Sequence, residues 1–126
     1  MSLTEQNSDR FSLTIIPGKQ IALFRWSGPI GLEERRLNVQ RMVQFCEQHN
    51  VRKVLVDGRD QYSTTGVADA FEFGSEVPVT MRGLRIAVVH RPDDDSLQFI
   101  ETVANNRGAL TQPFLDLEAA QAWLES

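Results

Sequence analysis

The sequence predicts a single α/β domain with a mainly parallel sheet of about five strands, an N-terminal hairpin and about four helices. Beyond the hairpin, short apolar runs alternate with longer segments of helical period, which is the order expected of βαβ units. The runs Val-Leu-Val at 54–56 and Ile-Ala-Val-Val at 86–89 are typical of strands buried on both faces. A chain of 126 residues also fits one domain with one core.

The N-terminal part predicts a tail followed by a hairpin. Residues 1–10 are polar, so we expect a flexible tail there and a domain over 11–126. Residues 11–15 alternate Phe, Leu and Ile with Ser and Thr, which is the period of a half-buried strand. Pro17-Gly18 marks a turn, and residues 21–26 form the second strand of an antiparallel pair.

A long helix and a buried strand come next. Residues 32–49 carry an apolar stripe at helical spacing, and Asn50 is a plausible terminator. The stripe consists of Leu32, Val39, Met42, Val43 and Cys46. Residues 53–57 then form a short apolar run, which predicts a central parallel strand.

The segment 58–66 is polar and is expected to be a loop at the carboxyl end of that strand. Residues 67–73 favour a helix that Val77-Pro78 ends, because the residue before a proline avoids the helical conformation. The predicted core-facing positions are Val67, Ala70, Phe71 and Gly74.

The C-terminal third predicts strand, helix, strand and helix. Residues 84–90 form a core strand, and residues 96–107 form a helix that Gly108 closes. Residues 113–115 suggest a short edge strand, since Pro113 cannot donate to a ladder. Asp116 caps a last helix over 117–125, which buries Ala120, Trp123 and Leu124.

Composition and charge narrow the function classes. The net charge of −4 argues against a duplex nucleic-acid binder, so no nucleic-acid partner is expected. Cys46 is the single cysteine, which excludes an intrachain disulfide and suits a reducing compartment. The polar start is unlike a signal peptide, and no apolar run reaches the length of a membrane helix. We therefore expect a cytoplasmic protein that is not an integral membrane protein.

Three C-terminal segments carry a family resemblance. They are Phe99–Gly108 (FIETVANNRG), Pro113–Asp116 (PFLD) and Ala119–Leu124 (AAQAWL). Together with the hairpin and the two core strands they resemble the SpoIIAA-like family, which has the STAS-type fold, over Phe11 to Leu124. The better-understood relatives are anti-sigma-factor antagonists. In these, a kinase phosphorylates a serine of an Asp-Ser-Ser-Gly motif after the central strand, and the added charge blocks partner binding.

The resemblance places that motif at Ser63-Thr64-Thr65-Gly66, with Thr65 at the modified position. Here Ser63 replaces the aspartate, and the loop from Asp57 is about two residues shorter. A phosphate at a helix start would be stabilised by free N–H groups and the helix dipole. The alternative is that these hydroxyls serve only as a helix cap.

Two further groups are candidate sites. Asp57, Arg59 and Asp60 lie at the carboxyl end of a parallel strand, where ligands bind in such sheets, and are a candidate pocket rim. The alternative is solvated loop charge. Asn105, Asn106 and Arg107 end a helix and form a candidate partner surface, or serve only in helix termination.

Other chemistry-bearing residues favour structural roles. Asp93, Asp94 and Asp95 beside His90 do not have the spacing of a calcium loop and favour helix capping. Cys46 and His49 are three residues apart on a helix, and Cys46 is expected in the core. No catalytic residue, metal or cofactor is predicted. The aromatic residues Phe24, Trp26, Phe71, Phe73 and Phe99 either fill the core or line an apolar ligand cavity.

Two function hypotheses follow. The first is a non-enzymatic regulatory domain that binds a regulatory protein through the segment Ser63 to Gly66. The second is a module that binds a small apolar molecule or lipid in an interior pocket, and an apolar cavity would favour it. A homodimer is also plausible, because an edge strand needs cover.

Overall fold

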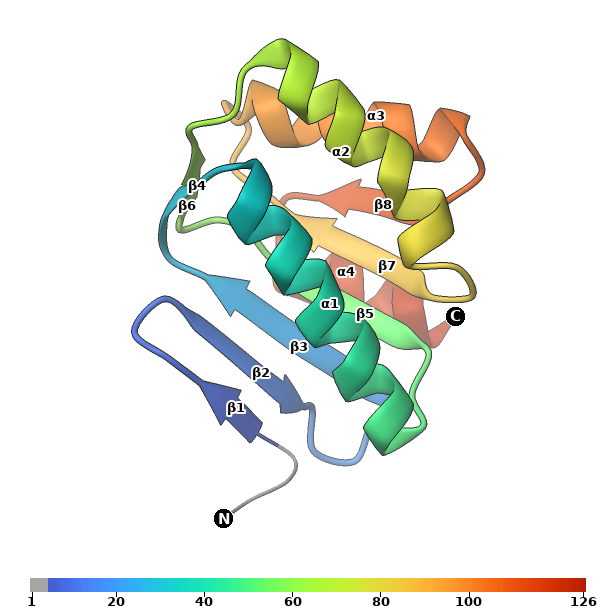
Figure 1. Cartoon of the computed structure of the whole chain (residues 1–126). Helices are drawn as coiled ribbons and strands as arrows, with labels where there is room; N and C mark the ends of the chain where they lie inside the picture. Colours follow the sequence, from blue (N-terminus) through green and yellow to red (C-terminus); the bar gives the residue numbers. More distant parts are fainter. Residues whose placement is uncertain (1–4) are drawn as a thin grey trace.

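The computed structural model describes residues 5–126, which form one six-stranded sheet with helices on both faces (Figure 1). The strand order is β1-β2-β3-β5-β7-β8, and a second two-stranded sheet joins β4 to β6. The strands are β1 Glu5–Asn7, β2 Phe11–Ile15, β3 Ile21–Trp26, β4 Gly28–Ile30, β5 Lys53–Asp57, β6 Gln61–Ser63, β7 Arg85–Val89 and β8 Leu110–Phe114. The helices are α1 Leu32–His49, α2 Val67–Thr80, α3 Asp95–Asn106 and α4 Leu117–Glu125.

The mixed sheet confirms the predicted fold class. β2 pairs antiparallel with β3, from Phe11 opposite Trp26 to Ile15 opposite Ala22. β3, β5, β7 and β8 then run parallel, each joined to its neighbour over five residues. The bounds of α1 and β5 are as predicted, and Asn50 ends α1 in the left-handed conformation at φ 53°.

The predicted tail is wrong over part of its length. Glu5–Asn7 form β1, which pairs antiparallel with β2 and covers its edge. The turn between them is closed by Ser8, whose hydroxyl accepts hydrogen bonds from the N–H groups of Arg10 and Phe11. Because β1 contains only polar residues, hydrophobic alternation gives no sign of it. Residues 1–4 of the predicted tail lie outside the described residues.

The segment 58–66, expected to be a loop, contains a strand. β6 pairs in parallel with β4, from Gly28 opposite Gln61 to Ile30 opposite Ser63. The two strands follow the carboxyl ends of β3 and β5 and extend the chain past the edge of the main sheet. Each is three residues long, which is too short for a periodic signal.

α2 continues to Thr80, through Pro78, and does not stop at Val77 as predicted. Proline removes the backbone bond to the residue four positions earlier and disfavours a helix interior. The last turn nevertheless holds, because Val77 and Met81 are buried and the Met81 N–H donates to the Val77 carbonyl at 2.9 Å. The predicted core face is also partly wrong, since Val67 and Phe71 are exposed while Phe73 is buried.

The C-terminal elements follow the prediction with small shifts. The Asp94 side chain caps α3, the Asp116 side chain caps α4, and Gly108 adopts φ +99° after α3. β8 starts at Leu110, three residues before the predicted edge strand. On α4, Ala120 and Leu124 are fully buried, whereas Trp123 is half-buried beneath the Arg85 guanidinium, 4.0 Å from the ring centroid.

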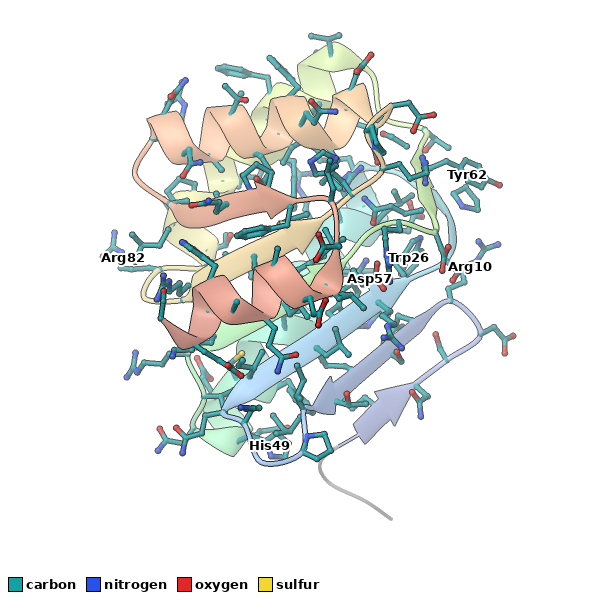
Figure 2. The ribbon with its side chains drawn as sticks, turned by 180° about the vertical axis from the view of Figure 1, so that it is seen from behind. Arg10, Trp26, His49, Asp57, Tyr62 and Arg82 are labelled. Carbon is teal, nitrogen blue, oxygen red and sulfur yellow. The ribbon has the colours of Figure 1, made fainter. Side chains whose placement is uncertain are left out.

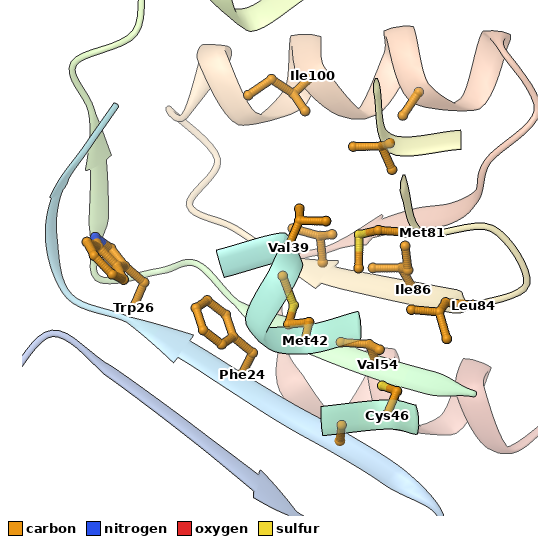
Figure 3. Close-up of a cluster of buried hydrophobic side chains, with 14 of the residues drawn as sticks. Phe24, Trp26, Val39, Met42, Cys46, Val54, Met81, Leu84, Ile86 and Ile100 are labelled. Atoms are coloured by element: carbon orange, nitrogen blue, oxygen red, sulfur yellow. The ribbon is translucent and has the colours of Figure 1, made fainter. Parts of the chain in front are cut away.

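Two separate apolar clusters hold the sheet. α1, α2 and α3 cover one face, and Figure 3 shows part of the larger cluster between α1 and the strands. α4 alone covers the other face, as the reverse view in Figure 2 shows. The smaller cluster there joins Ala120 and Leu124 to Ile21, Leu55, Ala87 and Val89. No helix in residues 5–126 combines the length and apolar character that crossing a membrane requires.

Candidate functional site

The carboxyl ends of β3, β5, β7 and β8 meet at one edge of the sheet, and the four helices begin there. Ligands and partners of open α/β sheets usually bind at this edge. The Arg91 guanidinium fixes the β5–β6 connection by donating to the carbonyls of Arg59 and Gln61, both at 2.6 Å. The Thr64 N–H donates to the Ile30 carbonyl at 2.8 Å, which ties the start of α2 to the start of α1.

The Ser63–Gly66 segment links β6 to α2 and is held by its own hydroxyls. The Ser63 hydroxyl accepts from the Thr65 N–H at 3.0 Å and from the Ser96 hydroxyl on α3 at 3.1 Å. The Thr64 hydroxyl donates to the Ile30 carbonyl at 3.2 Å, although the residue is exposed. The Thr65 side-chain oxygen is buried and has no hydrogen-bond partner in residues 5–126.

The cap interpretation of these hydroxyls is wrong. Gly66 occupies the N-cap position of α2, and within residues 5–126 no side-chain capping hydrogen bond is made there. Glycine has no side-chain oxygen, so the N-cap residue offers no side-chain acceptor to the first N–H groups of α2. The helix start therefore keeps the partial positive charge that favours an anionic or acceptor group.

Exposed apolar side chains flank this segment. Val67 is 77% exposed and Phe71 46% exposed, four residues apart and thus on one side of α2. Tyr62, 56% exposed on β6, precedes the segment (Figure 2). Isolated exposed apolar residues are ordinary, but a group beside one helix start indicates a contact surface.

Asp57, Arg59 and Asp60 form an ion-paired loop start. The Arg59 guanidinium donates to both Asp57 carboxylate oxygens at 2.9 Å, and Arg25 lies 3.4 Å from the same carboxylate. Burial by itself would raise the pKa of Asp57, but the hydrogen bonds from Arg59 and the two cationic charges lower it overall. Asp57 is buried, whereas Arg59 and Asp60 are exposed. Their role as a pocket rim stays a prediction.

Asn105, Asn106 and Arg107 are exposed at the end of α3. Arg107 occupies the C-cap position, and its guanidinium lies 5.2 Å from the centroid of the Phe71 ring. Cation–π contact of this kind joins the end of α3 to the exposed side of α2. The structure thus brings one residue of this predicted surface against Phe71 on α2.

Cys46, His49 and Asp94, for which the sequence favours structural roles, lie in the core or at a helix cap. Cys46 is buried in the larger cluster, and its burial raises the pKa of the thiol to about 11. His49 packs on Phe45 with ring centroids 4.3 Å apart. The Asp94 carboxylate accepts from the Leu97 N–H at 3.0 Å, which is a capping bond. Within residues 5–126, no three His, Cys, Asp or Glu side chains gather as a metal site requires.

The predicted aromatic group divides between core and surface. Phe24, Trp26 and Phe73 are buried, whereas Phe71 and Phe99 are exposed. Phe24 and Phe73 line an interior cavity of about 80 Å³ between the three-helix layer and the sheet. Most of its wall is aliphatic, from Val39, Met42, Val77, Ile86, Val88 and Ile100.

Five polar residues of the cavity wall were missed by the sequence analysis: Arg35, Asn38, Gln61, Glu101 and Thr111. Arg35 and Asn38 on α1 and Glu101 on α3 are at most 5% exposed and line the same cavity. A signal was present, because Arg35 and Asn38 share the stripe of Leu32, Val39 and Met42, and Glu101 lies between Leu97 and Ala104 on the buried face of α3. A polar side chain at a core position of an amphipathic helix is the pattern that marks such a site.

Comparison with solved structures shows a SpoIIAA-like fold. An uncharacterized DUF3478-family protein with a SpoIIAA-like fold from Shewanella loihica aligns at TM-score 0.61 and 17% identity, over 98% of each chain. An anti-sigma factor antagonist from Mycobacterium paratuberculosis aligns at TM-score 0.63 and 11% identity, over 96% of this chain and 99% of the other. No family profile and no curated protein matches this chain by sequence.

Proposed function

We propose that this protein is a cytoplasmic, non-enzymatic regulatory domain that binds a partner protein through the surface around the start of α2. One observation carries the proposal: Tyr62, Val67 and Phe71 expose apolar area on either side of the Ser63–Gly66 segment. Arg107 adds a cation to the same side through its contact with Phe71. The likeness in fold to an anti-sigma factor antagonist supports a regulatory role.

Phosphorylation is the regulation that this surface supports. A phosphate on Thr64 or Thr65 would place negative charge beside the uncapped start of α2 and beside the apolar contact residues. Thr64 is exposed, whereas the Thr65 side-chain oxygen is buried, so a kinase reaches Thr65 only when the segment opens. Ser63 supports the closed segment through its bonds to Thr65 and Ser96.

The test is affinity capture from the native host with matched variants. We expect the wild-type domain to capture a partner that the double variant Val67→Ser, Phe71→Ser loses, because the contact area is removed. Val79→Ser is the control, since Val79 is 67% exposed on the same helix but near its other end. Thr64→Glu and Thr65→Glu are expected to weaken capture, while the alanine variants retain it. If the Val67→Ser, Phe71→Ser double variant captured as much partner as Val79→Ser, the proposal would be contradicted.

We propose as a second function that the domain binds a small molecule in its interior. The cavity of about 80 Å³ favours this function, because it is mainly apolar and carries a few polar groups, as ligand sites do. Its volume of about 80 Å³ favours a ligand smaller than a lipid with a long acyl chain. A screen of small soluble molecules by thermal shift tests this function. Failure of every molecule to raise the melting temperature would count against it.

A further inference from the structure

The cavity wall is mainly apolar but carries polar side chains from α1, β6, α3 and β8. Arg35 and Asn38 lie three residues apart on α1, so their side chains leave the helix on the same side. Glu101 lines the cavity from α3 and accepts a hydrogen bond from the Thr111 hydroxyl at 2.6 Å. The aliphatic side chains of Val39, Val77 and Ile86 line the same cavity.

The donors on α1 lack protein partners. Arg35 is 5% exposed, and its Nε and one of its Nη atoms are buried without a hydrogen-bond partner in residues 5–126. The Asn38 amide oxygen accepts from Arg41 at 2.7 Å, which leaves its amide nitrogen as a second buried donor without a partner. Glu101 Oε2, on the same wall, and Asp94 Oδ2 are buried acceptors without a partner in residues 5–126 as well. Buried polar groups in folded proteins are nearly always bonded, so these unmet groups indicate that a guest molecule bonds to the cavity wall.

The lack of a direct salt bridge to Arg35 favours an anion as this guest molecule. Within the described residues, no carboxylate forms a salt bridge with Arg35, and its guanidinium lies 5.9 Å from the centroid of the Phe73 ring. Burial lowers the pKa of Arg35 to about 10, against the opposite influence of Asp94, so the side chain is still cationic at neutral pH. Asp94 attracts this cation from beyond salt-bridge distance, whereas an anion in the cavity would pair with it directly. A planar guanidinium matches a carboxylate in geometry.

The volume limits the size of the ligand. Because even one water needs roughly 10–15 Å³, the cavity of about 80 Å³ holds at most about five to eight non-hydrogen atoms. A carboxylic acid of four or five carbons has that size. Its alkyl part would lie against the aliphatic wall, and its carboxylate against the donors of Arg35 and Asn38.

We propose that the cavity between the three-helix layer and the sheet binds a short-chain aliphatic carboxylate, with Arg35 and Asn38 as its recognition residues. This inference rests on the second proposed function and names the ligand class for that site. Arg35 supplies the charge, and Asn38 supplies a neutral donor beside it. The mainly apolar wall favours an acid with a hydrocarbon chain.

The test is calorimetric titration of the full chain with sodium butyrate and sodium isovalerate, with butyramide as the uncharged probe. We expect saturable binding of an acid with a dissociation constant on the order of 1 mM or below, and at least tenfold weaker binding of the amide. Arg35→Met is expected to weaken acid binding at least tenfold. Arg36→Met is the matched control, because Arg36 is the neighbouring residue but pairs with Glu76 outside the cavity.

A second variant and a crystal structure keep the test decisive. If Arg35→Met fails to fold, Asn38→Leu removes the neutral donor and is expected to weaken acid binding as well. Binding of the amide as tightly as the acid would overturn the ligand class but leave the second proposed function standing. Crystals grown with 20 mM butyrate, about 20-fold above the expected dissociation constant, add a structural readout. If neither the acids nor the amide bind, and ordered waters bridge Arg35 to Asp94 in these crystals, the ligand class and the second proposed function are both overturned.

Discussion

The two faces of the sheet are built on the same strands but packed in different ways. On the α4 face, Ala120 and Leu124 meet Ile21, Leu55, Ala87 and Val89, and all six side chains are at most 2% exposed. On the other face, three helices enclose a larger cluster that contains a cavity and the buried polar side chains of Arg35, Asn38 and Glu101.

The difference shows where the molecule tolerates imperfect packing. A single helix can settle on a sheet at the distance that its small residues allow, and Ala120 lets α4 approach closely. Three helices must also pack on one another, and α2 crosses α3 where the Gly74 Cα faces the Ile100 carbonyl and Val103. We infer that the α4 face mainly stabilises the fold, while the three-helix face carries a function at some cost in stability.

The largest effect is expected from truncating the α4 face. Leu124→Ala removes a fully buried side chain and should lower the free energy of unfolding by about 4 kcal/mol. Urea titration measures this loss. Leu115→Ala is the control, because Leu115 is 59% exposed just before α4 and its truncation should cost less than about 0.5 kcal/mol. A small loss for Leu124→Ala would show that α4 contributes little to the core.

The next largest effect is a pH dependence of the free energy of unfolding, which arises from Glu101 on the three-helix face of the sheet. Burial raises the pKa of Glu101 from 4.5 to about 7, even though its bond to Thr111 acts in the opposite direction. The folded state therefore holds this proton more tightly than the unfolded chain. The associated stability is present below about pH 4.5 and is lost as the pH rises through about 7.

Glu101→Gln removes this titration and keeps an acceptor for Thr111. Relative to wild type, the variant should gain roughly 3 kcal/mol of unfolding free energy between pH 4.5 and pH 8. Urea unfolding at several pH values measures the difference. Glu118→Gln, at an exposed position of α4, is the matched control for the loss of one carboxylate. A constant difference between wild type and Glu101→Gln across this range would contradict the assignment.

Matched alanine-to-valine substitutions compare the packing of the two faces of the sheet directly. Ala120→Val adds two methyl groups to the closed cluster under α4 and should cost about 2 kcal/mol. Ala104→Val adds the same groups at a buried helical position that lines the cavity, and should change stability by less than about 0.5 kcal/mol. The difference between their thermal midpoints is the readout. Equal losses would mean that the cavity offers no room.

The smallest effect concerns the crossing of α2 and α3. A Cβ atom at Gly74 would lie 2.9 Å from the Ile100 carbonyl oxygen and 2.9 Å from the Val103 Cβ. Gly74→Ala should therefore destabilise the protein by about 1 kcal/mol, although helix propensity alone favours alanine by a similar amount. Chemical denaturation gives the sign, and a stabilised variant would show that the helices can separate without cost.

The sequence predicts much of the fold because local signals are strong there. The stripe of α1, the apolar runs of β5 and β7 and the caps at Asp94 and Asp116 each follow from residues close together in the chain. The errors lie where tertiary contacts override local preference. β1 is polar and exists because it pairs with β2, and α2 passes Pro78 because Val77 and Met81 are buried.

For the candidate sites, the sequence located the Ser63–Gly66 segment at a helix start but not its bonding. Only the fold shows that Gly66 is the N-cap, that Ser63 bonds to Ser96 on α3 and that the Thr65 side-chain oxygen is buried. The cavity was anticipated only as an alternative, and its polar residues were not. Arg35 and Glu101 come from helices separated by more than 40 residues, so no local pattern brings them to one wall.

The sequence by itself determined the alternation of helices and strands, the parallel core and the hydroxyl-rich start of α2, because spacing within one segment sets which side chains share a face. The tertiary structure decided which polar residues are buried, how the two faces differ and where the cavity lies. These depend on how helices that are distant in sequence pack together, and on the volume that their side chains leave between them.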